Sequence, residues 1–525
     1  MGSAPSIKAG QSNQVIPKAA APRLIGALWR LTRADAMAPR EIDPLLPPGV
    51  RLVARCLRLL RGPESRRGRP GERLARVLEQ EGPVAIKLGQ FLSTRADIFG
   101  PQFAEDLSRL KDHLTPFPDA IAAAEAQRAL GRPLNQIFAS FDSPVGAASL
   151  AQVHAARLTD GRAVAVKILR PGVEGRVARD IRALFLAASL AGRWIPGAAR
   201  LEPRAFAATI SRALELELDL RFEAAGADEL KNAMAADGFM SAPAVVWDGV
   251  AKRVLTMDWA AGDALSNGAV LAREGLDRPR LANDLIRGFL AQALDHGVFH
   301  ADLHEGNLFV DSGGRLIAVD YGIIGRLGPL ERRYLAEILW GFLNRDYARV
   351  AQVHFDAGYV AAHHDKAAFA QALRAVGEPI FGRVAADVSM GRLLAQLFDI
   401  TSLFEMRLRP ELVLLQKTMV TVEGVGRRID PSLDIWAAAE PIVRRWITAE
   451  LSPARRVAEI AREARAALTR IATGPSNAGE PHPSPSPSSP PTDRALSPRG
   501  RLDGVSLALG ALMAAMAFAA FALLH

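Results

Sequence analysis

The chain has 525 residues, of which 49% are hydrophobic, so it can form roughly two to four domains of about 150 residues with sizeable cores. It carries a formal charge of +9 and a single cysteine, which excludes an intrachain disulfide framework and favours a reducing compartment. The basic surplus favours phosphate or an anionic membrane face as a partner. The sequence has neither zinc-finger spacing nor a basic run interleaved with aromatic residues, which argues against nucleic-acid binding.

The N-terminal part divides into a flexible start and a helical extension. Residues 1–50 are predicted to be mostly flexible, because residues 1–22 are polar with scattered proline and glycine. Residues 51–135 are predicted to be helical, beginning with a basic amphipathic helix over residues 51–61. The extension contains Lys87-Leu88-Gly89-Gln90. A surface lysine and glutamine around a packing glycine are the alternative interpretation of this motif.

Residues 136–262 are predicted to form a strand-rich nucleotide-binding lobe. Residues 153–158 and 163–169 are apolar runs on either side of Thr159-Asp160-Gly161, and Asp-Gly between such runs is a strong hairpin signal. Residues 205–230 then follow a helical pattern.

A lysine and a glutamate in this lobe indicate a binding site for the phosphates of a nucleotide. The second strand contains Val164-Ala165-Val166-Lys167, and a lysine at this place holds the α- and β-phosphates of a nucleotide if a carboxylate fixes it. Glu223, in the helical run that follows, is the candidate partner. The alternatives are a solvent-facing lysine at a strand edge and an ordinary solvated helix face.

The strongest chemical signal is His300-Ala301-Asp302-Leu303-His304-Glu305-Gly306-Asn307, followed by Asp320-Tyr321-Gly322. Phosphoryl transfer needs a carboxylate near the attacking hydroxyl or water, and oxygen ligands for the magnesium that neutralises the phosphates. Asp302 and Asn307 lie on one loop and can supply both, while Asp320, at the end of a predicted hairpin, completes a magnesium site. The alternative is a polar turn whose Asp and Asn side chains are satisfied locally.

The C-terminal part contains a lobe, a linker and an anchor. Residues 263–450 are predicted to form a helical lobe that carries the catalytic loop. Residues 451–473 are predicted to form a basic amphipathic helix, which either packs on this lobe or contacts anionic lipid. Residues 474–504 form a Pro/Ser-rich linker.

Residues 505–524 contain no charged residue and are predicted to form a transmembrane helix, with a buried or dimerising helix as the alternative. Three arginines just before this segment place the catalytic body in the cytoplasm. The predicted location is therefore the bacterial inner membrane, crossed once.

Several motifs occur in a fixed order between residues 72 and 446. They are Lys87-Leu88-Gly89-Gln90, Ala147-Ala148-Ser149-Leu150-Ala151-Gln152-Val153-His154, Lys167, Glu217-Leu218-Asp219 with Glu223, His300-Ala301-Asp302 and Asp320-Tyr321-Gly322. The series resembles the UbiB/ADCK family of atypical kinase-like proteins. The expected fold is α+β, a two-lobed protein-kinase-like fold with an N-terminal helical extension and a C-terminal transmembrane helix.

The resemblance implies binding of ATP and Mg²⁺ and assigns roles to individual residues. Catalytic candidates are Asp302, Lys167 and Glu223, and metal-ligand candidates are Asn307 and Asp320. Nucleotide-binding candidates are Val145, Gly146, Ala147, Ala148, Ser149, Val153, Lys167 and Met257. Regulatory candidates are Lys87, Gln90, Glu217 and Asp219, since the helices that carry Lys87 and Gln90 are expected to fold over the cleft and meet both carboxylates.

The expected function is that of a membrane-anchored kinase or ATPase in ubiquinone (coenzyme Q) or related isoprenoid-lipid biosynthesis. The expected partners are membrane lipids, isoprenoid quinone precursors, other quinone-biosynthesis proteins and a second copy of the chain, and no nucleic acid. Two other classes stay open, a small-molecule kinase resembling aminoglycoside or choline kinases and a non-catalytic lipid-binding membrane scaffold. The Lys87/Gln90 motif argues against the first, and the full set of catalytic groups argues against the second.

Overall fold

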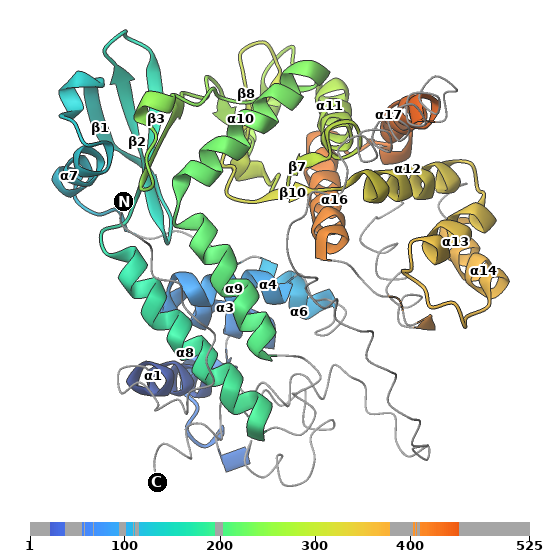
Figure 1. The fold of residues 1–525 in the computed structure, drawn as a ribbon, viewed down its shortest axis with the longest axis horizontal. Helices are drawn as coiled ribbons and strands as arrows, with labels where there is room; N and C mark the ends of the chain where they lie inside the picture. Colours follow the sequence, from blue (N-terminus) through green and yellow to red (C-terminus); the bar gives the residue numbers. More distant parts are fainter. Residues whose placement is uncertain are drawn as a thin grey trace, which may run out of the picture.

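The computed structural model describes residues 21–36, 55–56, 58–66, 68–93, 101–108, 110, 115–194, 203–378, 403–404, 406 and 410–450 (Figure 1). The amphipathic helix, linker and transmembrane helix predicted at residues 451–524 lie outside these ranges, as do most of residues 1–50. Within the described ranges, none of the helices combines the length and the apolar character that crossing a membrane requires.

The N-terminal helices form a small bundle with its own core. They are α1 (Ala21–Arg33), α3 (Pro70–Glu81), α4 (Pro83–Ser93) and α6 (Pro101–Ser108). Leu74 and Leu107 are buried in this core. Gly89 lies where an added Cβ would meet the side chain of Leu78, so it is a packing glycine that lets α4 approach α3. On its other side α4 joins the main core through Val84.

A four-stranded antiparallel sheet follows, in the order β1-β2-β3-β5. Its strands are β1 (Phe138–Ala147), β2 (Ala151–Leu158), β3 (Ala163–Leu169) and β5 (Val254–Asp258). The predicted hairpin is confirmed, and Gly161 supplies the positive φ of 89° at its turn. One face packs against α7 (Asp119–Leu130) through Val164, Val166 and Ile168. Because side chains alternate along a strand, Lys167 belongs to the other face.

Three helices connect the sheet to the bundle and to the second lobe. They are α8 (Val173–Trp194), α9 (Pro203–Glu217) and α10 (Leu220–Asp237). The continuous helical run predicted at residues 205–230 is wrong in one respect, since it breaks at Asp219. The carboxylate of Asp219 caps α10 by accepting a hydrogen bond from the backbone N–H of Arg221 at 3.2 Å. The chain therefore turns between α9 and α10 (Figure 1).

The second lobe is mainly helical. Its helices are α11 (Arg278–Ala291), α12 (Pro329–Leu343), α13 (Tyr347–Asp356), α14 (Lys366–Gly377), α16 (Pro410–Ile429) and α17 (Ile435–Glu450), with a π-helical turn at Gln292–His296. Short 3₁₀ helices occur at Pro63–Arg66, Leu134–Gln136, Trp247–Gly249, Gly268–Ala272 and Glu305–Asn307. The rings of Phe289 and Phe299 meet edge to face in the core, with centroids 5.8 Å apart.

Two small sheets support the loops of this lobe. One pairs β7 (Val298–His300) with β10 (Ile324–Arg326), and the other has the order β4 (Met240–Ser241), β9 (Leu316–Ala318), β8 (Leu308–Val310), β6 (Asp263–Ala264). The predicted hairpin of β8 and β9 is thus confirmed. The catalytic loop runs from β7 to β8, and Asp320 follows β9.

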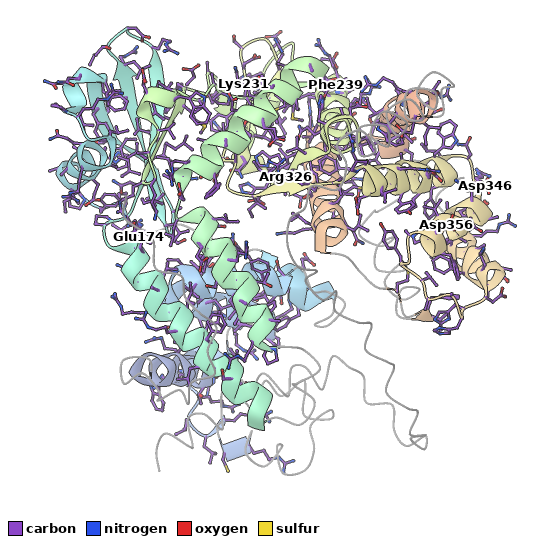
Figure 2. All side chains as sticks on the ribbon, in the orientation of Figure 1. Glu174, Lys231, Phe239, Arg326, Asp346 and Asp356 are labelled. Atoms are coloured by element: carbon purple, nitrogen blue, oxygen red, sulfur yellow. The ribbon has the colours of Figure 1, made fainter. Side chains whose placement is uncertain are left out.

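Ion pairs join elements that are far apart in the sequence. Arg326 of β10 pairs with Glu229 of α10, with 2.9 Å between Nη1 and Oε1, and Glu174 at the start of α8 pairs with Arg253 (Figure 2). Exposed pairs of this kind each stabilise a fold by about 1 kcal/mol or less. They contribute to the register between elements, while the buried apolar cores provide most of the stability.

Candidate active site

A lysine from the sheet and two carboxylates from the second half of the chain form one ion cluster. The Nζ of Lys167 lies 2.7 Å from Oε1 of Glu223 on α10 and 3.0 Å from Oδ1 of Asp320. Lys167 and Glu223 are largely buried, whereas the side chain of Asp320 is 52% exposed. The structure therefore brings together three of the residues that the sequence assigns to the phosphate and metal site.

Electrostatics keeps Lys167 and Asp320 of this cluster charged. Burial alone lowers the pKa of Lys167, but the attraction of Asp320 and Glu223 raises it above its ordinary value. The neighbouring Lys167 lowers the pKa of Asp320 to about 2, so Asp320 is ionised at neutral pH. Burial raises the pKa of Glu223, against the pull of Lys167.

The backbone at Asp320 adopts an unusual conformation. Its φ of 61° lies in the left-handed region, which residues other than glycine rarely adopt. The neighbouring Tyr321 is buried, and its hydroxyl donates a hydrogen bond to the carbonyl oxygen of Ala318 at 2.6 Å. This bond clamps the turn after β9, and such strain typically persists where the surroundings hold a functional side chain in place.

His300 braces the catalytic loop. Its Nδ1 accepts a hydrogen bond from the backbone N–H of Asp302 at 3.1 Å, so its Nε2 carries the proton and donates to the carbonyl oxygen of Val319, also at 3.1 Å. Burial lowers the pKa of His300, which agrees with a neutral ring. Because Val319 precedes Asp320, the imidazole connects the backbone at Asp302 to the turn that carries the metal-ligand candidate.

Asn307 completes this connection. Its Nδ2 donates to the carbonyl oxygen of Asp302 at 3.1 Å, which leaves the amide oxygen as an acceptor, and its own backbone oxygen accepts from Val319 N–H at 2.9 Å. Among the described residues, no three or more His, Cys, Asp and Glu side chains converge as a metal cluster. One carboxylate plus one amide oxygen suits Mg²⁺, which usually takes few protein ligands together with phosphate oxygens and waters. Asn307 and Asp320 thus fit the predicted magnesium site.

The Ala-rich loop, residues 145–149, includes the last residues of β1 and the start of the connection to β2. Within residues 145–149 the side chain of Val145 is exposed and Ser149 is buried. The loop is closed by a bond from Ala148 N–H to the carbonyl oxygen of Ala151 at 2.8 Å. Arg170, just after β3, donates from Nε to the carbonyl oxygen of Ala148 at 2.8 Å and so holds the loop against the sheet.

The other nucleotide-binding candidates share the face of Lys167. Val153 lies directly opposite Lys167 on β2, and Leu255 lies opposite it on β5. Met257 is two residues from Leu255 and therefore points to the same side of the sheet. Val153 and Met257 are thus apolar residues on the same face of the sheet as the lysine.

The regulatory candidates are only partly brought together. Lys87 of α4 is buried and forms an ion pair with Glu217 at the end of α9. Gln90 lies one turn further along α4. Among the described residues Lys87 forms no ion pair with Asp219, whose carboxylate instead lies 2.6 Å from Nη2 of Arg221 and caps α10. The expected meeting of α4 with Asp219 stays a prediction. The helix break at Asp219 turns this carboxylate to a neighbour on its own helix.

Comparisons with known proteins agree with this geometry. Residues 109–354 match the ABC1 atypical kinase-like domain, and residues 373–434 match the UbiB helical domain. The chain is 39% identical over 388 residues to Probable protein kinase UbiB of Marinobacter nauticus, a match that covers 73% of this chain and 71% of that protein. A Pseudomonas putida protein of the same name is 40% identical over 388 residues, which cover 73% of this chain and 72% of the relative. The chain belongs to the UbiB family of atypical kinase-like proteins.

A solved structure extends this assignment to the fold. The complex of Rv3197 with erythromycin from Mycobacterium tuberculosis has a TM-score of 0.50 and 25% identity, and the match covers 70% of this chain and 93% of that chain. The predicted kinase-like fold with mixed helices and strands is therefore confirmed for this UbiB-family chain. The transmembrane helix predicted at residues 505–524 stays a prediction.

The sequence did not assign a role to two supporting residues of this UbiB-family site. Arg170 anchors the Ala-rich loop, and the buried Gln292 accepts a hydrogen bond from His300 N–H at 3.1 Å through Oε1. Gln292 lies in the π-helical turn after α11, a one-residue change in helical period that apolar spacing does not reveal. His300 is part of a motif that the sequence revealed. Its hydrogen bond to Val319 could not be predicted, because it depends on how β9 packs next to the catalytic loop.

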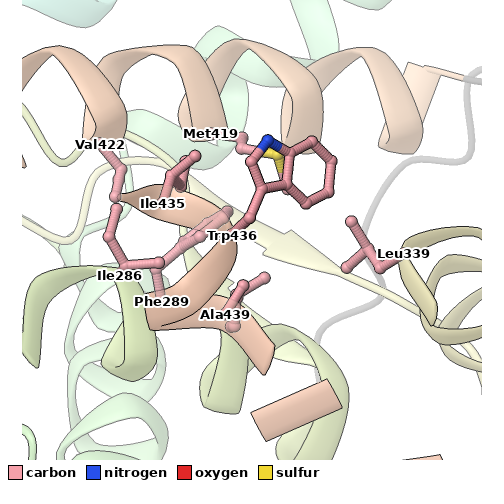
Figure 3. Close-up of a pocket in the computed structure, with 9 residues that line it drawn as sticks. Ile286, Phe289, Leu339, Met419, Val422, Ile435, Trp436 and Ala439 are labelled. Carbon is pink, nitrogen blue, oxygen red and sulfur yellow. The ribbon is translucent and has the colours of Figure 1, made fainter. Parts of the chain in front are cut away.

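A separate apolar pocket lies within the helical lobe. Phe289 of α11, Leu339 of α12, Met419 of α16 and Trp436 of α17 line it (Figure 3). The lining has no charged side chain that could hold a phosphate, so this pocket is distinct from the proposed nucleotide cleft.

Proposed function

We propose that this UbiB-family protein is an ATP-dependent kinase or ATPase that supports ubiquinone or related isoprenoid-lipid biosynthesis. The observation that carries the enzymatic part is the ion cluster of Lys167, Glu223 and Asp320, joined through Val319 to the loop of Asp302 and Asn307. The pathway is supported by family membership, through the UbiB relatives at about 40% identity.

Each group has a distinct chemical task in this proposal. Lys167, fixed by Glu223, binds the α- and β-phosphates of ATP. Asn307 and Asp320 would hold Mg²⁺, which supplies positive charge to the phosphates when bound. Asp302 is 36% exposed, and its carboxylate takes the proton of the attacking hydroxyl or water.

The proposal is tested by ATP turnover of the full-length chain with phospholipid and phenolic lipid-like additives. Asp302→Asn is expected to lower turnover by about 10²- to 10⁴-fold while changing ATP affinity little, because the base is lost and the phosphate contacts remain. Asp356→Asn, on the exposed end of α13, is the matched control. Equal turnover by the parent and Asp302→Asn contradicts the assignment.

Two further measurements address the substrate class. Screening small hydroxylated acceptors tests the aminoglycoside- or choline-kinase-like alternative, and a parent that binds lipid but never turns over ATP would support the scaffold alternative. Deletion of the gene followed by lipid-quinone profiling tests the pathway, with loss of quinone as the expected result. An unchanged quinone profile contradicts a role in this pathway.

We propose further that residues 505–524 anchor the protein to the bacterial inner membrane, with the catalytic body in the cytoplasm near lipid precursors. The support is the uncharged sequence of this segment and the arginines before it. Truncation after Gly474 is expected to move the protein into the soluble fraction at raised salt. A full-length chain that is soluble without detergent contradicts the anchor.

A further inference from the structure

Helix α16 is fastened to the catalytic loop at two points. The hydroxyl of Thr418 shares its proton between the carbonyl oxygen of Leu414 on its own helix, at 2.8 Å, and the buried carbonyl oxygen of Ala301, at 3.1 Å, directly before Asp302. Further along α16, Arg428 forms an ion pair with Glu305 in the same loop. Figure 1 shows α16 beside β7 and β10, the strands that support this loop. The side chains on this stretch of α16 are therefore held in a defined position relative to the catalytic carboxylate.

The residue before Thr418 is a lysine that has no ion pair among the described residues. Lys417 is partly buried and forms no ion pair within the described part of the chain. The other two lysines of this region differ, since Lys87 pairs with Glu217 and Lys167 pairs with two carboxylates.

Lys417 is nevertheless within electrostatic reach of the site. Burial lowers its pKa most strongly, the carboxylate of Asp302 opposes this by raising it, and the neighbouring Lys87 lowers it further. A buried ammonium without a counter-ion is costly, and an incoming anion relieves that cost. Within the described part of the chain, Lys417 is thus a cation without an ion pair, on a helix that packs against the catalytic loop, and it feels the charge of Asp302.

The catalytic loop itself supplies no positively charged side chain for the terminal phosphate. Between Asp302 and Asn307 it carries Leu303-His304-Glu305-Gly306, with no lysine or arginine. Charge on the transferred phosphoryl group needs fixed cations for its stabilisation. Lys167 is committed to the other phosphates in the function proposed above, so the terminal group lacks a side-chain cation from this loop.

We propose that Lys417 binds the terminal phosphoryl group of ATP and stabilises it during transfer. In that step the bond from the β,γ-bridging oxygen to the terminal phosphorus breaks, and a bond from the acceptor oxygen to that phosphorus forms. ADP leaves with the electron pair of the broken bond, and the acceptor proton passes to Asp302. The proposal rests on the ATP-dependent function, and it gives the UbiB helical region, which contains Lys417, a direct part in catalysis.

The test compares three variants of the full-length protein. Lys417→Met removes the charge at similar length, Lys417→Arg keeps it, and Lys366→Met removes an exposed lysine of α14 as the matched control. Binding of Mg-ATP, Mg-ADP and AMP is measured by titration calorimetry, together with ATP turnover and the melting temperature without nucleotide.

Lys417→Met is expected to weaken ATP binding at least about tenfold while ADP and AMP binding stay within twofold, because only ATP carries the contacted group. Turnover is expected to fall about 10²-fold, with partial recovery in Lys417→Arg. The melting temperature without nucleotide is expected to stay equal or rise, since the lysine forms no ion pair. Lys417→Gln replaces the methionine variant if that variant does not fold.

Four outcomes overturn the proposal. Equal loss of ATP and ADP affinity, or a lowered melting temperature restored by arginine, would show a structural role. Unchanged ATP binding and turnover in Lys417→Met, with an active parent, removes Lys417 from catalysis and leaves the ATP-dependent function intact. A parent that binds no nucleotide overturns both proposals.

Discussion

Lys167 and Lys417 come from different lobes and have opposite electrostatic surroundings. Lys167 lies on a strand of the four-stranded sheet and forms ion pairs with two carboxylates. Lys417 lies on α16 next to Thr418 and forms no ion pair with any residue that the structure describes. In the first arrangement, the two carboxylates hold the side chain of Lys167 in place and balance its charge before any ligand binds. The second keeps positive charge available for a ligand, at some cost in stability.

Two glycines near the site, Gly146 at the end of β1 and Gly325 in β10, also differ in their surroundings. The Ala-rich loop is open around Gly146, while the strand pair that carries the catalytic loop is closed by Gly325 against the ring of Phe299. The nucleotide-binding side therefore has room to adapt, and the catalytic side has almost none. Substitutions on the two sides should consequently fail in different ways.

The largest effect on ligand binding should come from a substitution that breaks the ion pair between Lys167 and Asp320. Asp320→Asn removes a metal-ligand charge and one partner of Lys167, so Mg-ATP affinity is expected to fall by about 10²-fold or more. Titration with Mg-ATP measures the loss, and Asp356→Asn on α13 provides the control (Figure 2). Parent-like affinity in Asp320→Asn would remove Asp320 from the metal site.

The next test concerns the third lysine, Lys87, whose pairing with Glu217 connects the N-terminal bundle to the kinase-like body. If this bundle closes the cleft to proteins, the parent should phosphorylate generic protein acceptors only weakly. Lys87→Ala should raise that signal, because the loss of the ion pair loosens α4 from α9. Radiolabel transfer to a basic protein measures it, and efficient labelling by the parent with no change in the variant contradicts the closure.

The two glycines offer a stability test of the rigid and open sides. Gly325→Ala places a Cβ 2.0 to 2.4 Å from ring atoms of the buried Phe299, so the free energy of unfolding should fall by about 1–3 kcal/mol. Gly146→Ala meets no atom within 4 Å and should change it by less than about 1 kcal/mol. Urea denaturation of both variants measures the difference, and equal losses would show that the two sides are equally rigid.

The smallest expected effect is a pH dependence of the unfolding free energy, which comes from the ion pair between Asp320 and Lys167. The folded-state pKa of Asp320 is about 2, below the ordinary value near 3.9, so its pairing stabilises the fold fully above about pH 4. This contribution is lost as the pH falls toward 2. The difference in unfolding free energy between the parent and Asp320→Asn should be constant from pH 5 to 8 and shrink below pH 4. A difference that grows on acidification would contradict the pairing.

Local patterns in the sequence determined the strands, the hairpins and the chemical groups of the site. Asp-Gly between apolar runs encodes the turn of β2 and β3. The spacing of Asp302, Asn307 and Asp320 around the β8–β9 hairpin indicated the loop that we propose for phosphoryl transfer. Each of these signals depends on neighbours within a few residues. The UbiB-type motif series was readable for the same reason.

Only the tertiary structure decided which distant groups meet. Lys87 pairs with Glu217 and not with Asp219 because a helix break turns Asp219 toward Arg221, and periodicity did not show that break. No sequence motif pointed to Lys417, and its electrostatic interaction with Asp302 depends on the packing of α16 against the catalytic loop. Such contacts depend on how whole helices pack. The free energy of packing comes from many buried side chains at once, so no single stretch of sequence encodes it.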